Sequence, residues 1–437
     1  MKWTPFQLIV TAVFGLFLLF GIAMFALYGG AGTNGGVGTV VIWGTLDTIE
    51  INHVLDHLRQ QDKSFQNVSY VQKDASTYEQ TLTDAMASGS GPDLFFVSQD
   101  QVSFFANKIT SIPYATLSQS SFSNAYLDEG QLFLTSTGAL ALPIAIDPLV
   151  LYWNQDLFAS AGVPQPPQYW SDVLNTAARL TSLDGNSNVV RSAIALGVWT
   201  NVTHAKEILT ALFLQAGDTI LSTSQGGTTI VSFGTTPMGA TENPAASALD
   251  FYTEFSNPTK LSYTWNRSLP QSIDAFTGGT LAMYIGLASD YPGLAARNPN
   301  IHFAVAPLPQ VQGSNTRLTF GEMTGVAIAR TSQNQKGALA IAQKLASVQG
   351  ISAMVTQTAL PSTRRDVTED TSASAAQTVF TQSALISRAW LDPDPAATTG
   401  IFQTMVESVL SGASQPITAV GDAQQGLQLL LTTGAVH

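Results

Sequence analysis

The chain has no cysteine, and charged residues make up only 11% of its 437 residues. Without cysteine there is no disulfide, no thiolate metal ligand and no lipid-modified N-terminal cysteine. This absence does not identify a compartment, because a cysteine-free protein is stable on either side of a membrane.

Positive charge is especially scarce: 18 Lys and Arg stand against 30 Asp and Glu, a formal net charge of −12. Nucleic-acid binding requires basic stripes that neutralise phosphates, so we expect no nucleic-acid partner. The length is sufficient for one membrane segment and roughly two domains, whose cores need no covalent staples.

One long uncharged segment is present near the N-terminus, residues 6–28 (FQLIVTAVFGLFLLFGIAMFALY). At about 1.5 Å per residue it is long enough to cross a ~30 Å hydrocarbon core. Lys2 precedes it, which predicts a cytoplasmic N-terminus and a C-terminal domain outside the membrane. We expect a single-pass anchor in the cell membrane. A cleaved signal peptide is the alternative, with Gly30-Ala31-Gly32 as a possible site.

Residues 29–38 (GGAGTNGGVG) have the composition of a flexible linker. They contain a formal Gly-x-Gly-x-x-Gly, but that fingerprint binds dinucleotides only between a strand and a helix. Here it follows the apolar segment and precedes a predicted strand, so we interpret it as a tether.

From residue 39 the pattern alternates between strands and helices. Residues 39–44, 68–71 and 93–97 are predicted strands, and Ile51, Val54, Leu55 and Leu58 mark the first of two intervening helices. This order predicts a parallel α/β sheet whose ligands lie beyond the carboxyl ends of the strands. Further strands are predicted at 140–152, 280–285, 301–306 and 325–329, with a helix at 337–346 and helices from 401 to 431.

The segment LPIAIDPLVLYWN, residues 142–154, runs into QDLF and then AGVP, and PPQYWSDVLNTAARLT follows at 166–181. This block resembles the family 1 extracellular solute-binding proteins of ABC transporters, the group that includes maltose-binding protein. Trp153 replaces a tyrosine of the family pattern. Weaker blocks follow the same order: VIWG at 41–44, SGSGPDLFFVSQD at 88–100, FTGGTLAMYIG at 276–286, NPNIHFAVAPLPQ at 298–310 and ALPSTRRDV at 359–367.

The resemblance implies a two-lobed periplasmic-binding-protein fold, type II-like, that the chain crosses three times. The crossings are expected near residues 144–148, 307–312 and 346–350. Lobe 1 would hold residues 39–145 and 310–346, and lobe 2 would hold 146–309 and 347–437. A ligand between the lobes would close them by a hinge motion.

Candidate ligand contacts combine aromatic faces with carboxylates, because sugars offer both C–H patches and hydroxyls. Trp43 and Asp47 follow the first strand, Asp100 follows the third, and Asp147 lies at the first crossing. A packed ring, a helix cap and a hinge hydrogen bond are the structural alternatives for Trp43, Asp47 and Asp147, respectively.

Later segments supply the remaining candidates. Tyr291 follows the AMYIG strand, where the family commonly has a stacking aromatic, and Glu322 precedes the strand at 325–329. Trp265 and Trp390 lie in loop-like contexts and are equally compatible with the core.

The resemblance therefore predicts a binding subunit that captures a mono- or oligosaccharide and delivers it to ABC permease subunits. We expect no catalysis, no cofactor, no metal and a monomer. A membrane-anchored sensor, an extracellular enzyme of the same fold, and a binding protein for another solute remain alternatives.

Overall fold

The computed structural model describes residues 37–223, 229–239, 241–367 and 373–434. The predicted anchor at 6–28 and nearly all of the linker at 29–38 lie outside the described residues. Among those described, no single helix has the length and apolarity to cross a membrane, although two helices bent by 64°, 335–345 and 348–358, pass that test together.

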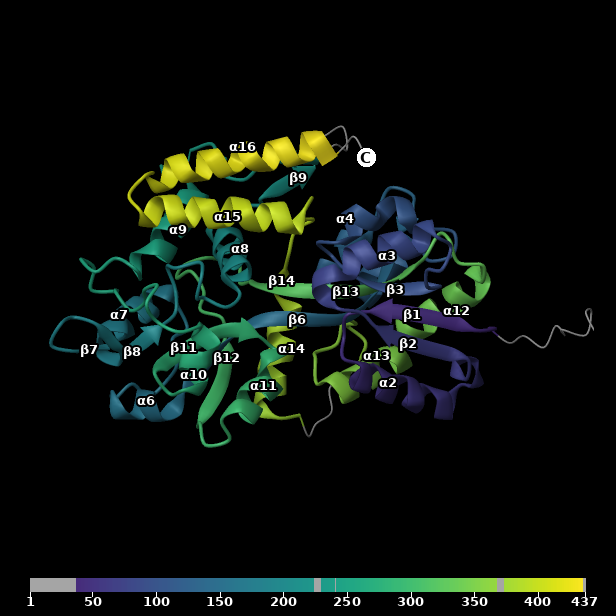
Figure 1. Cartoon of the computed structure of the whole chain (residues 1–437), viewed down its shortest axis with the longest axis horizontal. Helices are drawn as coiled ribbons and strands as arrows, with labels where there is room; N and C mark the ends of the chain where they lie inside the picture. Colours follow the sequence, from purple (N-terminus) through teal and green to yellow (C-terminus); the bar gives the residue numbers. More distant parts are fainter. Residues whose placement is uncertain (1–36, 224–228, 240, 368–372, 435–437) are drawn as a thin grey trace, which may run out of the picture.

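The chain forms two α/β lobes joined by long shared strands (Figure 1). In lobe 1, β1 (Val40–Gly44) lies between β2 (Val68–Gln72) and β3 (Leu94–Ser98), and all three are parallel. The crossover helices are α2 (Thr48–Gln61) and α3 (Tyr78–Ala87). The parallel α/β sheet predicted for this part of the chain is confirmed.

Two antiparallel strands connect the lobes, β6 (Ala141–Asn154) and β13 (Thr319–Ile328). The first half of β6 pairs only with β13, which pairs in turn with β3 of lobe 1. The second half of β6 pairs with β11 (Leu281–Leu287) and β12 (Phe303–Pro307) of lobe 2. A single strand therefore belongs to both sheets, and its middle forms a hinge.

Lobe 2 contains the strand order β12–β6–β11–β8–β7, with helices on both faces (Figure 1). Its elements are α6 (Gln155–Ser160), α7 (Trp170–Leu180), β7 (Ser182–Leu183), β8 (Val189–Ile194), α8 (Ala205–Ala216), β9 (Leu221–Thr223), β10 (Thr229–Val231), α9 (Pro244–Glu254), α10 (Ser272–Thr277), α11 (Asp290–Arg297), α14 (Ala375–Leu385), β14 (Ser387–Arg388), α15 (Pro395–Leu410) and α16 (Pro416–Gly434).

Lobe 1 also contains α12 (Gln335–Leu345) and α13 (Val348–Thr358), and its short elements are η1 (Lys63–Phe65), η2 (Ala75–Thr77), α4 (Val102–Phe105), η3 (Ala106–Lys108), β4 (Ile112–Pro113), α5 (Gln119–Ala125), η4 (Asp128–Phe133) and β5 (Gly138–Ala139). Apolar side chains form two clusters in lobe 1, with α2 and α12 in one and α3 in the other, and a third cluster fills lobe 2. Each fully buried Leu, Val, Ile or Phe stabilises its lobe by roughly 1.5–3 kcal/mol.

Helix α13 departs from the predicted lobe boundary. The sequence places 347–437 in lobe 2, but α13 packs against α2, and its Ile351, Ala353 and Met354 are buried in the lobe 1 core. The apolar face of α13 is thus buried against α2. We therefore propose that the chain crosses between the lobes for the third time after α13, and not near residue 346. The other predicted boundaries stay predictions.

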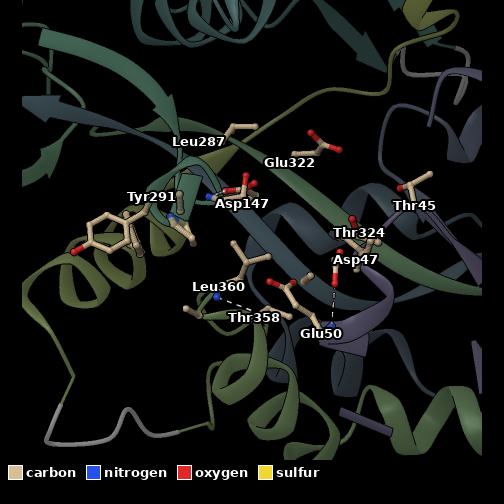
Figure 2. Close-up of a pocket in the computed structure, with 17 residues that line it drawn as sticks. Thr45, Asp47, Glu50, Asp147, Leu287, Tyr291, Glu322, Thr324, Thr358 and Leu360 are labelled. Carbon is tan, nitrogen blue, oxygen red and sulfur yellow. Dashed lines mark hydrogen bonds between the residues drawn. The ribbon is translucent and has the colours of Figure 1, made fainter. Parts of the chain in front are cut away.

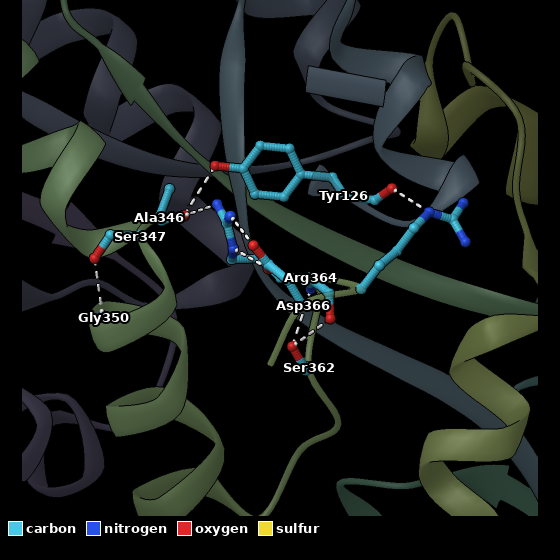
Figure 3. A network of polar contacts seen from close by, with 8 residues as sticks. Tyr126, Ala346, Ser347, Gly350, Ser362, Arg364 and Asp366 are labelled. Carbon is cyan, nitrogen blue, oxygen red and sulfur yellow. Dashed lines mark hydrogen bonds and ion pairs between the residues drawn. The ribbon is translucent and has the colours of Figure 1, made fainter. Parts of the chain in front are cut away.

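The chain leaving α13 is fixed to lobe 1 by a polar network (Figure 3). Arg364 donates to the Ala346 carbonyl at 3.0 Å and pairs with Asp366, while the Tyr126 hydroxyl donates to the same carbonyl at 2.9 Å. Arg365 donates from Nε to the Tyr126 carbonyl at 3.0 Å. These contacts hold residues 364–366 against lobe 1, at the start of α13.

Candidate functional site

A cavity of about 430 Å³ lies between the lobes. Figure 2 shows side chains of both lobes around it, with Asp47 and Glu50 on one side and Tyr291, whose ring points outward, on the other. Its volume lies within the range of about 300–1,000 Å³ typical of small-molecule sites.

The lobe 1 wall is the loop from β1 to α2, with Thr45, Leu46, Asp47 and Glu50. Asp47 caps α2: its Oδ1 accepts from the backbone N–H of Ile49 at 2.7 Å and of Glu50 at 3.2 Å. An aspartate at this position satisfies donors that the first helical turn leaves free. The cap fixes the loop beside the cavity.

The hinge strands supply the floor of the cavity. Asp147 of β6 lies directly opposite Glu322 of β13 in the antiparallel register, and Ala145 lies opposite Thr324. Since alternate residues of a strand share a face, these four side chains all line the cavity. Two carboxylates directly opposite each other repel. Asp147 is held to lobe 2 by Ser289, whose backbone N–H donates to its Oδ1 at 3.0 Å.

The lobe 2 wall follows β11, where Leu287, Ala288, Ser289, Tyr291 and Pro292 line the cavity with Phe380 of α14. Tyr291 packs edge-on against Phe380, with ring centroids 5.9 Å apart and an interplanar angle of 77°. The Tyr291 side is therefore an aromatic and apolar surface.

Behind this wall, Asp290 accepts from the Tyr284 hydroxyl at 2.8 Å and from the Leu287 N–H at 3.2 Å. Its Oδ2 also lies 3.0 Å from Nε2 of His204. Burial lowers the pKa of His204, but the pairing with Asp290 outweighs it, so the pKa lies above its ordinary value. The Asp290 carboxylate is therefore already hydrogen-bonded by groups of the protein itself.

The floor carboxylates have raised pKa values. Removal from bulk water raises the pKa of Asp147 to about 6, against the opposing effect of the Ser289 hydrogen bond. Glu322 is exposed to the cavity but enclosed by protein on its other sides, and burial together with the charges of Asp100 and Asp147 raises its pKa to about 8. The pKa of Glu50 is raised by burial and by Asp47. The cavity therefore disfavours the ionised forms of these carboxyl groups when no cation is near them.

Residues 62–350 match the family model described as bacterial extracellular solute-binding protein. The chain belongs to this family. The match begins directly after α2, ends at the start of α13 and includes both hinge strands, β6 and β13. The family is the maltose-binding-protein-like group of ABC solute-binding proteins.

Solved structures share the fold of this solute-binding protein. A cyclo/maltodextrin-binding protein complexed with maltotetraose has a TM-score of 0.71 at 17% identity, covering 90% of this chain and 96% of its own. The cyclic α-maltosyl-1,6-maltose-binding protein of Arthrobacter globiformis gives 0.73 at 15% identity, with 90% and 99% covered. An ABC transporter solute-binding protein of Thermotoga lettingae, bound to α-D-tagatose, gives 0.65 at 21%, with 90% and 99% covered.

Curated relatives match over a shorter stretch. Binding proteins of Brucella abortus and Brucella suis are 26% identical over 112 residues, which is 25% of this chain. The alignment spans only 26% of the length of these relatives.

The structure brings four of the eight predicted contacts to the cavity, namely Asp47, Asp147, Tyr291 and Glu322. Two more, Asp100 and Trp390, lie with Glu322 around a separate space of about 30 Å³. There Lys206 pairs with the buried Asp392 at 2.7 Å. Ligand contact by these six residues stays a prediction.

The remaining two candidates are placed elsewhere. Trp265 is 1% exposed in the lobe 2 core, and its indole N–H donates to Asn201 at 2.9 Å. Its polar atom is thus satisfied internally, and the ring does not line the cavity, which corrects the predicted contact. Trp43 is half-buried and does not line the cavity either; the ammonium of Lys73 lies 3.7 Å from its ring centroid.

Several lining residues were absent from the sequence prediction: Thr45, Glu50, Ser289, Thr324, Thr358, Leu360 and Phe380. Glu50 follows the capping Asp47 by one helical turn, a spacing that places it near the same loop. Ala359 has φ of 56° and ends α13, which turns Leu360 toward the cavity. No sequence signal pointed to Phe380, which comes from a helix beyond the third crossing.

Proposed function

We propose that this protein captures a carbohydrate, a mono- or oligosaccharide, between its lobes and delivers it to ABC permease subunits in the membrane. Residues 6–28 would hold it on the outer face of that membrane. The open form admits the solute, and closure about β6 and β13 encloses it. No reaction is proposed for the chain.

The observation that carries this proposal is the composition of the cavity between the lobes. Tyr291, packed on the buried Phe380, offers aromatic surface on lobe 2. Asp47, Glu50, Asp147 and Glu322 offer acceptors on lobe 1 and the hinge. Aromatic surface packs against C–H patches, and carboxylates accept from hydroxyls. The saccharides named for the structural neighbours support the same ligand class.

A thermal-shift screen tests the proposal. The full chain, in a detergent without a sugar headgroup, would be heated with sugars, polyols, amino acids and polyamines. A ligand that binds only the folded state raises the melting temperature according to RT ln(1 + [L]/Kd). We expect a shift with a saccharide series. A shift with another solute and none with any saccharide would overturn the ligand class.

A further inference from the structure

The charges around the cavity are of one sign. Four carboxylates line it, those of Asp47, Glu50, Asp147 and Glu322, and none of its lining residues is Lys, Arg or His. Two basic side chains of lobe 2 near the floor carboxylates are already paired, His204 with Asp290 and Lys206 with Asp392. The charge of His204 offsets part of the negative charge of Asp147 and Glu322, but the cavity lining itself supplies no cation.

The carboxylates are also largely without hydrogen-bond donors. Asp47 uses Oδ1 for the helix cap and Asp147 uses Oδ1 for Ser289. No side-chain hydrogen bond or ion pair joins Glu50 or Glu322 to another described residue. An enclosed carboxylate without a partner is costly, and a cleft lined by one sign of charge attracts the opposite sign.

We infer that the solute carries a protonated amine together with hydroxyl groups, as an amino sugar does. This inference rests on the proposed carbohydrate function and specifies the charge of its ligand. The ammonium is expected near Asp147 and Glu322, which face each other across the hinge strands. The uncharged face of the ring would lie toward Tyr291 and Phe380.

A metal ion fits the same charge less well. Within the described ranges, no three Asp, Glu, His or Cys side chains are grouped closely enough to hold one ion. The carboxylates are instead spread over a cavity of about 430 Å³, which apolar Leu287 and Leu360 also line. Such spacing matches a polyatomic ligand whose charge occupies one end and whose carbon skeleton fills the rest.

Calorimetric titration of matched sugars at pH 7 tests the inference. The probes are glucosamine against glucose, galactosamine against galactose, and chitobiose with free amines against cellobiose, with spermidine as a cation that lacks hydroxyls. We expect one amino sugar to bind at least roughly tenfold more tightly than its neutral partner, since two or three partly exposed ion pairs sum to that ratio. The preference should shrink as salt rises.

A charge-matched pair of variants separates a local effect from net charge. Glu322→Gln should weaken binding of the amino sugar several-fold more than it weakens binding of the neutral sugar. Asp250→Asn removes one exposed charge on α9, outside the cavity, and should leave both affinities as they are.

Each other outcome decides a different point. A neutral sugar that binds as tightly as its amino partner overturns the inference and upholds the proposed function. Binding of spermidine and of no sugar would uphold a cationic ligand and overturn the proposal that the ligand is a carbohydrate. A chain that remains folded and binds none of the probes overturns both.

Discussion

The carboxylates behind the lobe 2 wall and those that face the cavity from lobe 1 and the hinge differ in what holds them. In lobe 2, Asp290 has three partners and the buried Asp392 has Lys206 and Thr398. Glu50 of lobe 1 and Glu322 of the hinge face the cavity and have no such side-chain partners among the described residues. Paired carboxylates stabilise the fold, whereas unpaired ones destabilise it and are available to a ligand.

Removal of a paired carboxylate should have the largest effect. Asp290→Ala leaves the Tyr284 hydroxyl and the Leu287 N–H without their acceptor and separates His204 from its partner. We expect the free energy of unfolding to fall by about 3 kcal/mol, measured by chemical denaturation. Asp250→Ala, at an exposed site, is the control and should lie within about 0.5 kcal/mol of wild type. Equal effects of the two changes would contradict the stabilising role of the contacts that Asp290 makes.

Removal of an unpaired carboxylate should instead stabilise the fold. The pKa of Glu322 is about 8 in the folded protein, above its ordinary value of 4.5, so its protonated form favours folding. The contribution is present below pH 4.5 and is lost as pH rises through 8. Glu322→Gln should therefore raise the melting temperature at pH 8–9 more than at pH 5, in the absence of ligand. If the melting temperatures of variant and wild type changed with pH in parallel across this range, ionisation of Glu322 would not destabilise the fold.

The smallest effect is expected at Asp47, which combines both roles. Asp47→Ala removes the acceptor for Ile49 and Glu50 and should lower stability by about 1 kcal/mol. Asp47→Ser keeps a capping oxygen without the charge and should restore most of that loss. If serine were as destabilising as alanine, charge and not capping would be the contribution of Asp47 to the fold.

Much of the fold could be predicted from the sequence because its local signals agree. The alternation of β-branched strands and amphipathic helices predicted β1, α2, β2 and β3, and the apolar run at 140–152 predicted the hinge strand β6. The order of elements between 186 and 275 could not be predicted. There, short strands such as β9 and β10 pair only with each other, and the helices are separated by polar loops.

The site was predictable where the sequence identified a crossing between the lobes or the end of a strand. Asp147 and Glu322 lie within β6 and β13, Tyr291 lies at the start of α11 just after β11, and each lines the cavity. The tryptophans could not be assigned in this way, because an aromatic ring suits a core as well as a ligand. Trp265 is in the core since Asn201, remote in sequence, accepts its indole N–H. A hydrogen-bond partner so remote in the sequence leaves no local sequence signal.

The most direct test of ligand capture at this cavity compares two tyrosines of equal exposure, Tyr291 at 36% and Tyr169 at 37%. Only Tyr291 lines the cavity. The best saccharide from the thermal-shift screen would be titrated calorimetrically into wild type, Tyr291→Ala and Tyr169→Ala. We predict that Tyr291→Ala binds roughly tenfold more weakly, through loss of ring contact, and that Tyr169→Ala binds as wild type does. Equal affinity in all three folded proteins would contradict capture between the lobes.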